Sequence, residues 1–310
     1  MSRADRQAGL RAEIESCISD RAFALAYQPI VHLDTGTLAG VEALCRFHDG
    51  APPERRFRQS ERLGLAADLD LAIIERALDD VAALPQGDVS VNLSPSTILD
   101  ERLCDLLVGA DVGGERLVIE VTEHARIPDY QKAQDQLAVI RESGIRLAVD
   151  DAGAGYSTFE HILSLRPDMI KMDRSITHDI DSDGARRALA AALVLFGADI
   201  GATIVAEGVE TSDEIAALRR AGIHWAQGFA LGPPAMLPLP PLAYEPGAPD
   251  DEATRRSARA RVQTALASVR SAERELEATV ATARETGLSW EEVADILGMT
   301  RQGASKRYRQ

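Results

Sequence analysis

Acidic and amide side chains, with one lysine, lie within or just after a series of short apolar runs and are the residues best suited to chemistry. In chain order they are Glu42, Asn92, Glu120, Glu123, Asp150, Asp151, Lys171, Glu207 and Gln227. Carboxylates gathered in one site repel one another and resist desolvation, so such a set needs cations. Carboxylate and amide oxygens with no cysteine or histidine indicate magnesium or manganese, not structural zinc. The adjacent Asp150 and Asp151 are suited to bridge two ions.

The apolar runs that carry these residues have the length of β-strands. We predict strands at Leu25–Val31, Leu38–Phe47, Val89–Leu93, Leu117–Val121, Arg146–Asp150, Met169–Lys171, Thr203–Ala206 and Trp225–Leu231. Between most of them lie helix-sized segments: Ser60–Leu84, Ser96–Val108, Tyr130–Ser143, Ser157–Leu165, Ala185–Gly201 and Ser212–Ala221. Eight strands alternating with helices predict a TIM-like (β/α)8 barrel, whose active site lies at the carboxyl ends of the strands.

In such a barrel the polar residues share one rim. Taken singly, each acid could cap a helix or form half of an ion pair, as Glu123 and Asp151 could. The whole set in register predicts a metal site, because perturbed charges concentrate at functional sites.

The first two predicted strands depart from the parallel pattern. Only His32–Thr37, which contains Asp34-Thr35-Gly36, separates them. This is the length of a turn and leaves no room for a crossover helix. We therefore expect the first strand to be antiparallel in an otherwise parallel barrel.

Composition favours an acidic soluble protein. The 310 residues carry a net charge of −15, and residues 1–249 hold 39 acidic against 23 basic side chains. This imbalance suits a metal site better than a basic nucleic-acid groove. The N-terminus lacks the pattern of a signal peptide, and the longest apolar stretch, Ala188–Ala198, is too short to span a bilayer. Cys17, Cys45 and Cys104 show no paired spacing, so we expect reduced thiols, a cytoplasmic location and no membrane partner.

Eight ordered motifs resemble the EAL-domain cyclic di-GMP phosphodiesterases. They are Tyr27–Val31 (YQPIV), Val41–Arg46 (VEALCR), Val91–Ser94 (VNLS), Ile119–Glu123 (IEVTE), Asp150–Ser157 (DDAGAGYS), Ile170–Asp173 (IKMD), Ala206–Thr211 (AEGVET) and Ala226–Phe229 (AQGF). The resemblance runs from about Ile14 to Pro234. It implies a barrel with an antiparallel first strand, hydrolysis of cyclic di-GMP to linear pGpG, and two Mg²⁺ or Mn²⁺ ions per site.

The resemblance also implies residue roles. One ion would be bound by Glu42, Asn92, Glu120 and Asp150, and the second ion with its waters by Asp150, Asp151 and Glu207. Lys171 would orient the attacking hydroxide, Glu207 would act as general base or as a metal ligand, and Arg46 would meet a phosphate. Gln28, Leu44 and Gln227 would contact the substrate or metal-bound water.

Three features bear on activity. Ala152 and Ala154 stand where family members usually carry Phe and Thr, in a loop thought to couple metal binding to dimer contacts. Glu123 and Glu210, which resemble the acids that anchor this loop, are present. Phe47-His48-Asp49-Gly50 replaces an aromatic-plus-His-Pro pattern, a change expected at a surface turn. The intact metal set favours an enzyme. The alternative is a transcription regulator whose barrel senses cyclic di-GMP with weak or no hydrolysis.

Beyond the barrel, the sequence predicts a helical module. We place the barrel at 1–236, a Pro-rich linker or strapping segment at 237–251, a connecting helix at 252–286 and a helix-turn-helix at 287–310. Ser289 and Glu292 form a capping box, and Gly298 and Thr300 mark the turn. The second helix carries residues suited to duplex DNA: Arg301, Gln302, Ser305, Lys306 and Arg307.

Other interpretations of this tail remain open. A basic C-terminal helix could instead bind a protein partner or simply be solvated. The apolar stripe Val262–Val280 could form a homodimer, as paired DNA half-sites favour, or it could pack on the barrel, since Glu273 interrupts its heptad pattern.

Overall fold

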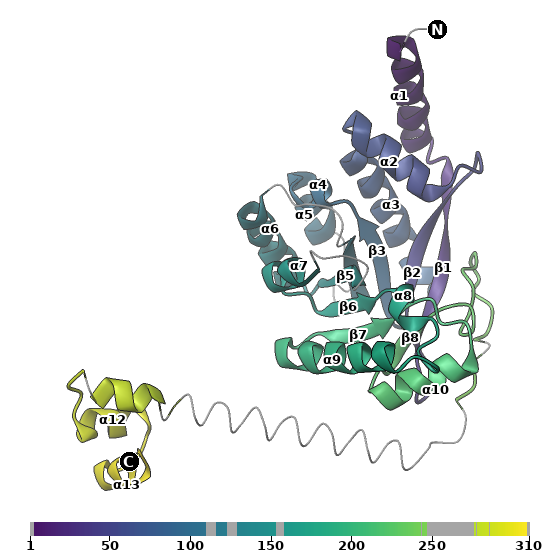
Figure 1. The fold of residues 1–310 in the computed structure, drawn as a ribbon. Helices are drawn as coiled ribbons and strands as arrows, with labels where there is room; N and C mark the ends of the chain where they lie inside the picture. Colours follow the sequence, from purple (N-terminus) through teal and green to yellow (C-terminus); the bar gives the residue numbers. More distant parts are fainter. Residues whose placement is uncertain are drawn as a thin grey trace. The chain divides into compact units, whose positions relative to one another are not determined.

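The chain forms two compact units, Met1–Pro249 and Asp250–Gln310 (Figure 1). The computed structural model describes residues 3–109, 116–122, 129–152, 158–242, 244–246, 276, 278–284 and 286–308.

The first unit is the predicted barrel. Its eight strands close in sequence order. They are β1 (Phe23–His32), β2 (Leu38–Phe47), β3 (Asp88–Leu93), β4 (Leu117–Thr122), β5 (Arg146–Ala152), β6 (Met169–Met172), β7 (Thr203–Ala206) and β8 (Trp225–Gln227). The predicted extension of β8 to Leu231 was wrong. Beyond Gln227 the backbone turns and forms hydrogen bonds with the backbone of Val209, in the loop after β7. The two segments are so close that a Cβ at Gly228 would lie 2.2 Å from the Val209 backbone.

β1 is antiparallel to both of its neighbours, which confirms the prediction from the short turn. It pairs with β2 from Phe23↔Phe47 to Val31↔Leu38, whereas it pairs with β8 only from Ile30 to His32. The turn is closed by backbone bonds between His32 and Thr37 and between Gly36 and His32. All other neighbouring strands are parallel, so their carboxyl ends share one rim.

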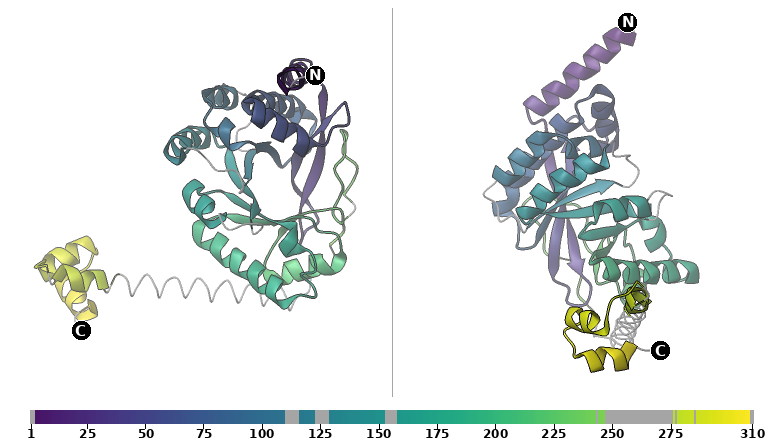
Figure 2. Two further views of the ribbon diagram at one scale, coloured as in Figure 1. Left: turned by 45° about the horizontal axis from the view of Figure 1, so that its top comes forward. Right: turned by 90° about the vertical axis from the view of Figure 1, so that its left-hand side faces the viewer.

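Helices form a layer outside the strands (Figures 1 and 2). They are α1 (Arg3–Ser19), α2 (Pro53–Leu63), α3 (Ala66–Asp80), the 3-10 helix η1 (Val81–Ala83), α4 (Pro95–Ile98), α5 (Glu101–Gly109), α6 (Tyr130–Glu142), α7 (Thr158–Leu165), α8 (Arg174–Thr177), α9 (Gly184–Ile200) and α10 (Ser212–Ala221). Two predicted helices were wrong because each is divided. Ser60–Leu84 is broken at Gly64, which ends α2 with φ +68°, and Ser96–Val108 is split between α4 and α5.

Apolar side chains fill the space between strands and helices, and a separate apolar layer lies inside the barrel. Val118, Ala148 and Met169 form this inner layer, with Trp225 packed against it. Glu120 lies two residues beyond Val118 on the same strand, so it faces the same interior at a higher level. The polar residues at the rim therefore rest on an apolar floor.

The segment after β8 packs on the barrel. Leu237, Leu239, Leu242 and Tyr244 contact the main hydrophobic core, and the Tyr244 hydroxyl donates to the Leu33 carbonyl at 2.7 Å. The described part of the Pro-rich region thus takes the strapping form that its sequence left open.

The second unit contains α12 (Trp290–Ile296) and α13 (Arg301–Tyr308). The capping box predicted at Ser289 and Glu292 is confirmed. Val280, Val293, Ala294 and Ala304 form a small core, so the last residue of the predicted stripe is used inside this unit. Residues 252–275, with most of the predicted connecting helix and stripe, lie outside the described residues. No helix in the described parts of the chain is long and apolar enough to cross a membrane.

Candidate active site

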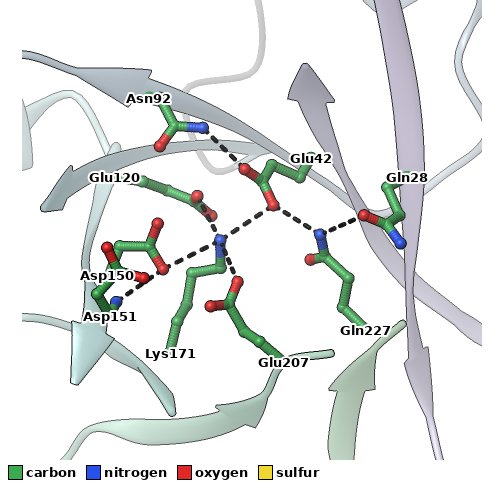
Figure 3. A network of polar contacts seen from close by, with 9 residues as sticks. All are labelled: Gln28, Glu42, Asn92, Glu120, Asp150, Asp151, Lys171, Glu207 and Gln227. Carbon is green, nitrogen blue, oxygen red and sulfur yellow. Dashed lines mark hydrogen bonds and ion pairs between the residues drawn. The ribbon is translucent and has the colours of Figure 1, made fainter. Parts of the chain in front are cut away.

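The barrel brings the predicted polar residues into one largely buried cluster at the carboxyl ends of its parallel strands (Figure 3). The contributing residues are Gln28 from β1, Glu42 from β2, Asn92 from β3, Glu120 from β4, Asp150 and Asp151 from β5, Lys171 from β6, Glu207 after β7 and Gln227 from β8. Residues far apart in the sequence meet because each strand delivers one or two of them to the same rim.

Lys171 lies at the centre of this cluster, with 1% of its surface exposed. Its Nζ is 2.7 Å from Glu120 Oε2, 2.7 Å from Glu207 Oε1, 3.0 Å from Glu42 Oε2 and 3.4 Å from Asp150 Oδ1. Burial opposes its charge, but these carboxylates outweigh burial and hold the pKa of Lys171 well above its ordinary value. One positive charge faces four carboxylates, so the cluster has an excess of negative charge.

The excess of negative charge helps to raise the pKa values of two acids in the cluster. Burial, together with repulsion from Glu42 and Asp150, outweighs the attraction of Lys171 and raises the pKa of Glu120 to about 8. Burial likewise raises the pKa of Glu207 well above its usual value. Without further cations, the cluster binds protons at neutral pH that exposed carboxylates would release.

Glu42 is the acid best supported by hydrogen bonds. Its Oε1 accepts from Asn92 Nδ2 at 2.7 Å, and its Oε2 accepts from Gln227 Nε2 at 2.6 Å. Burial would raise the pKa of Glu42, but Lys171 and the two amides outweigh burial and lower it. Glu42 is therefore held in its charged form more readily than Glu120 and Glu207, whose pKa values are raised.

A second group of oxygens lies on one side of Lys171. Asp150, Asp151 and Glu207 each offer a carboxylate oxygen, and these three atoms lie within 4.8 Å of one another. Asp151 has a positive φ of 61°, uncommon for a residue other than glycine, and its N–H donates to Asp150 Oδ1 at 2.9 Å. With this backbone conformation, the carboxylates of both adjacent aspartates reach the same group of oxygens.

The donor set fits divalent cations. Charge is unbalanced by several negative units, and the ligands are the hard oxygens that Mg²⁺ and Mn²⁺ prefer. Within the described residues, Gln227 Oε1 is also buried without a hydrogen-bond partner. A bound ion or its water would satisfy this carbonyl.

The other predicted residues lie apart from the acids. Leu44 is half-buried and Arg46 is exposed on β2; alternation along the strand places both on the face of Glu42. Arg46 Nη1 donates to its neighbour's carbonyl, Cys45 O, at 2.9 Å. Glu210 forms an ion pair with Arg174 at 2.7 Å.

The structure describes only some of the positions where the loop after β5 departs from the family pattern, and of the acids that resemble its anchors. Ala152 is fully buried at the end of β5 beside Met172, whereas Glu123, Ala154 and the rest of 153–157 lie outside the described residues.

Sequence reasoning missed one member of the site. The backbone carbonyl of Gly232 accepts from Gln28 Nε2 at 3.3 Å. A carbonyl is present at every residue, so no side-chain pattern could reveal it.

In the second unit, the residues predicted to bind DNA lie on α13. Arg301, Gln302, Lys306 and Arg307 are exposed, and Ser305 is half-buried. α13 contains no acidic residue.

The fold and the site together define a (β/α)-barrel protein with one antiparallel strand. Its rim carries carboxylates gathered around a lysine. Residues 11–234 match the EAL domain family, and the chain belongs to this family.

Individual relatives share this region. The chain is 33% identical over 262 residues to an uncharacterized signaling protein of Caulobacter vibrioides. This match covers 80% of this chain and 32% of that protein. It is 30% identical over 253 residues to the cyclic di-GMP phosphodiesterase NbdA of Pseudomonas aeruginosa, with 77% and 32% covered. The chain thus spans about a third of the length of these curated relatives.

Among solved structures, Klebsiella pneumoniae BlrP1 in a manganese and cyclic di-GMP complex superimposes with a TM-score of 0.63. It is 32% identical, and the match covers 69% of this chain and 56% of that one.

Proposed function

We propose that the barrel is a phosphodiesterase that hydrolyses cyclic di-GMP to linear pGpG with the help of Mg²⁺ or Mn²⁺. The observation that carries this proposal is the buried acid cluster, where one lysine faces four carboxylates. The names of a relative and of a structural neighbour, a cyclic di-GMP phosphodiesterase and a manganese and cyclic di-GMP complex, support the substrate and the metal class.

Two ions would share the proposed ligands. Glu42, Asn92, Glu120 and Asp150 would hold one, and Asp150, Asp151 and Glu207 would hold the other. When bound, the ions would supply positive charge to the attacked phosphate and make water acidic enough to react at neutral pH.

The protein's own groups position the substrate and move the proton. Lys171 is held among its four carboxylate partners and would orient the attacking hydroxide once bound ions take over part of those carboxylates. Glu207 accepts the proton of the attacking water as general base, or serves as a metal ligand, as its place in the oxygen group also allows. Gln28, Leu44 and Gln227 would contact the dinucleotide, and the exposed Arg46 would meet a phosphate.

The proposal predicts strict dependence on a divalent ion. Purified protein with cyclic di-GMP and Mn²⁺ should give pGpG on chromatography. Product formation should stop when the ion is chelated and should resume when it is restored. A protein that binds cyclic di-GMP but makes no pGpG with either ion would instead be the sensor, the alternative that Ala152 and Ala154 leave open.

We further propose that the second unit is a helix-turn-helix that binds duplex DNA through α13. The exposed cations on a helix without acids support this. A homodimer would allow two such helices to read paired half-sites.

The DNA proposal predicts a salt-dependent weakening when positive charge is removed. Arg301→Ala, Lys306→Ala and Arg307→Ala together should weaken duplex binding and reduce the slope of log K against log salt by about 0.9 for each phosphate that the protein no longer neutralises. Fluorescence anisotropy of a labelled duplex at several salt concentrations measures both. Removing three exposed arginines of α2, by Arg55→Ala, Arg58→Ala and Arg62→Ala, is the matched control. Equal weakening in both variants would show non-specific attraction and would favour a protein partner for α13.

A further inference from the structure

The segment after β8 runs alongside β1, on the edge that β8 leaves open. We call residues 232–242 and 244–246 the strap. Ala235 and Tyr27 exchange both backbone hydrogen bonds, with N–O distances of 2.7 and 3.0 Å. Most of the strap lies beyond residue 234, where the match to the family ends.

A chain of hydrogen bonds joins the strap to the acid cluster. The Gly232 carbonyl accepts from Gln28 Nε2 at 3.3 Å, and Gln28 Oε1 accepts from Gln227 Nε2 at 3.0 Å. The same Gln227 nitrogen donates to Glu42 Oε2 at 2.6 Å. Figure 3 shows the two glutamines and Glu42 in this order. All three side chains are more than 90% buried, so water does not compete for these bonds.

The acceptors at its two ends, the Gly232 carbonyl and the Glu42 carboxylate, set the direction of this chain. A backbone carbonyl can only accept, so Gln28 must turn its amide nitrogen toward Gly232 and its oxygen toward Gln227. Gln227 must then present its nitrogen to Gln28, and with it to Glu42. Its own oxygen, Oε1, is directed elsewhere and is the buried carbonyl without a partner among the described residues.

Close packing and a φ of +158°, which L side chains rarely adopt, explain why glycine stands at this position. A Cβ at Gly232 would lie 2.6 Å from Pro29 Cγ, well inside van der Waals contact. A larger residue would move the strap away from β1. Because the Gly232–Gln28 bond is already long, that movement would break it.

We propose that the strap is a positioning element of the acid cluster. The Gly232 carbonyl anchors the amide of Gln28, Gln28 and Glu42 together orient Gln227, and Gln227 helps to hold the Glu42 carboxylate ready for a divalent ion. Gly232 is not among the proposed ligands, and it acts through the two glutamines. The proposal rests on the metal site of the proposed function.

The test is Mn²⁺ affinity, measured by calorimetry on the full chain. Gly232→Ala should lower the affinity by up to roughly 10-fold, at the low end of the 10- to 100-fold loss that follows removal of a direct partner of a metal ligand. Adding Pro29→Ala removes the atom that the new methyl group meets and should restore part of the affinity, because the φ of +158° at Gly232 remains unfavourable for alanine. Gln28→Met leaves the strap backbone untouched and should cause a similar loss. Gly232→Ala should then have little further effect in the Gln28→Met background, because both changes act on one chain of bonds.

Tyr244→Phe is the matched control, since it loosens the lower end of the strap but leaves the Gly232–Gln28 bond. Unchanged Mn²⁺ affinity in Gly232→Ala, an equal loss in Tyr244→Phe, or additive losses in the double variant would each overturn the proposal. Since affinity is read without turnover, a chain that binds Mn²⁺ but makes no pGpG would refute the proposed hydrolysis and still decide the role of the strap.

Discussion

Replacing Glu42 with alanine is expected to abolish cyclic di-GMP hydrolysis while the barrel stays folded. The variant removes a proposed ion ligand that Asn92, Gln227 and Lys171 all hold in place. Loss of an outer-shell partner already costs metal sites about 10- to 100-fold in affinity or activity, so loss of the ligand itself should cost at least about a hundredfold. Stability should change much less, because removing one carboxylate also relieves the negative excess of the cluster.

Chromatography of pGpG, with circular dichroism to follow the fold, measures both parts of this prediction. Glu75→Ala is the matched control: Glu75 is a half-exposed acid of α3 paired with Arg21, away from the cluster. It should leave turnover unchanged. If Glu42→Ala kept its turnover and its dependence on Mn²⁺, the assignment of the metal site would be wrong.

Replacing Lys171 with methionine is expected to destabilise the ion-free protein strongly. Methionine fills a similar volume but leaves four buried carboxylates without their central cation. Breaking a buried ion pair by removing one partner costs about 3–5 kcal/mol in the free energy of unfolding. Urea unfolding in the presence of a chelator measures this loss, and Lys132→Met, which removes an exposed lysine of α6, is the control. A loss no larger than that of Lys132→Met would show that Lys171 does not balance the cluster.

The loss should depend on pH in a defined direction. The pKa of Glu120 is raised from an ordinary 4.5 to about 8 in the folded protein, and removing Lys171 should raise it further. A raised carboxyl pKa means that the folded state binds protons more tightly, so the linked stability is present at low pH and is lost as pH rises through the folded value. The Lys171→Met variant should therefore be closer to the native protein at pH 5 than at pH 8. Added Mn²⁺ should restore stability at pH 8, because it replaces the missing charge.

The sequence predicted the strands and the polar rim well, for a physical reason. In the apolar runs that lead to Glu120 or Asp150, the residues that form the strand and the charged residue of the site are neighbours in the sequence. The short turn at Asp34–Gly36 likewise determined the direction of β1 locally. Each of these features is encoded within a few positions of the chain.

Features that depend on distant partners could not be predicted in this way. The position of Lys171 between four carboxylates follows from the closure of the barrel, and the end of β8 follows from Val209 in another loop. Helix breaks were missed for a different reason. Gly64 sits inside an amphipathic stretch, and pattern alone does not separate a tolerated glycine from a C-cap.

The reversed direction of β1 also decides where the chain enters and leaves the barrel. Phe23 pairs with Phe47 at the carboxyl end of β2, so α1 joins the barrel on the side of the acid cluster. The strap instead finishes beside Leu33, where β1 ends on the opposite side. A circularly permuted barrel would need a new linker that spans the 10 residues of β1, or about 33 Å at 3.3 Å per residue. Fluorophores attached at the two ends would accordingly report on opposite faces of the barrel.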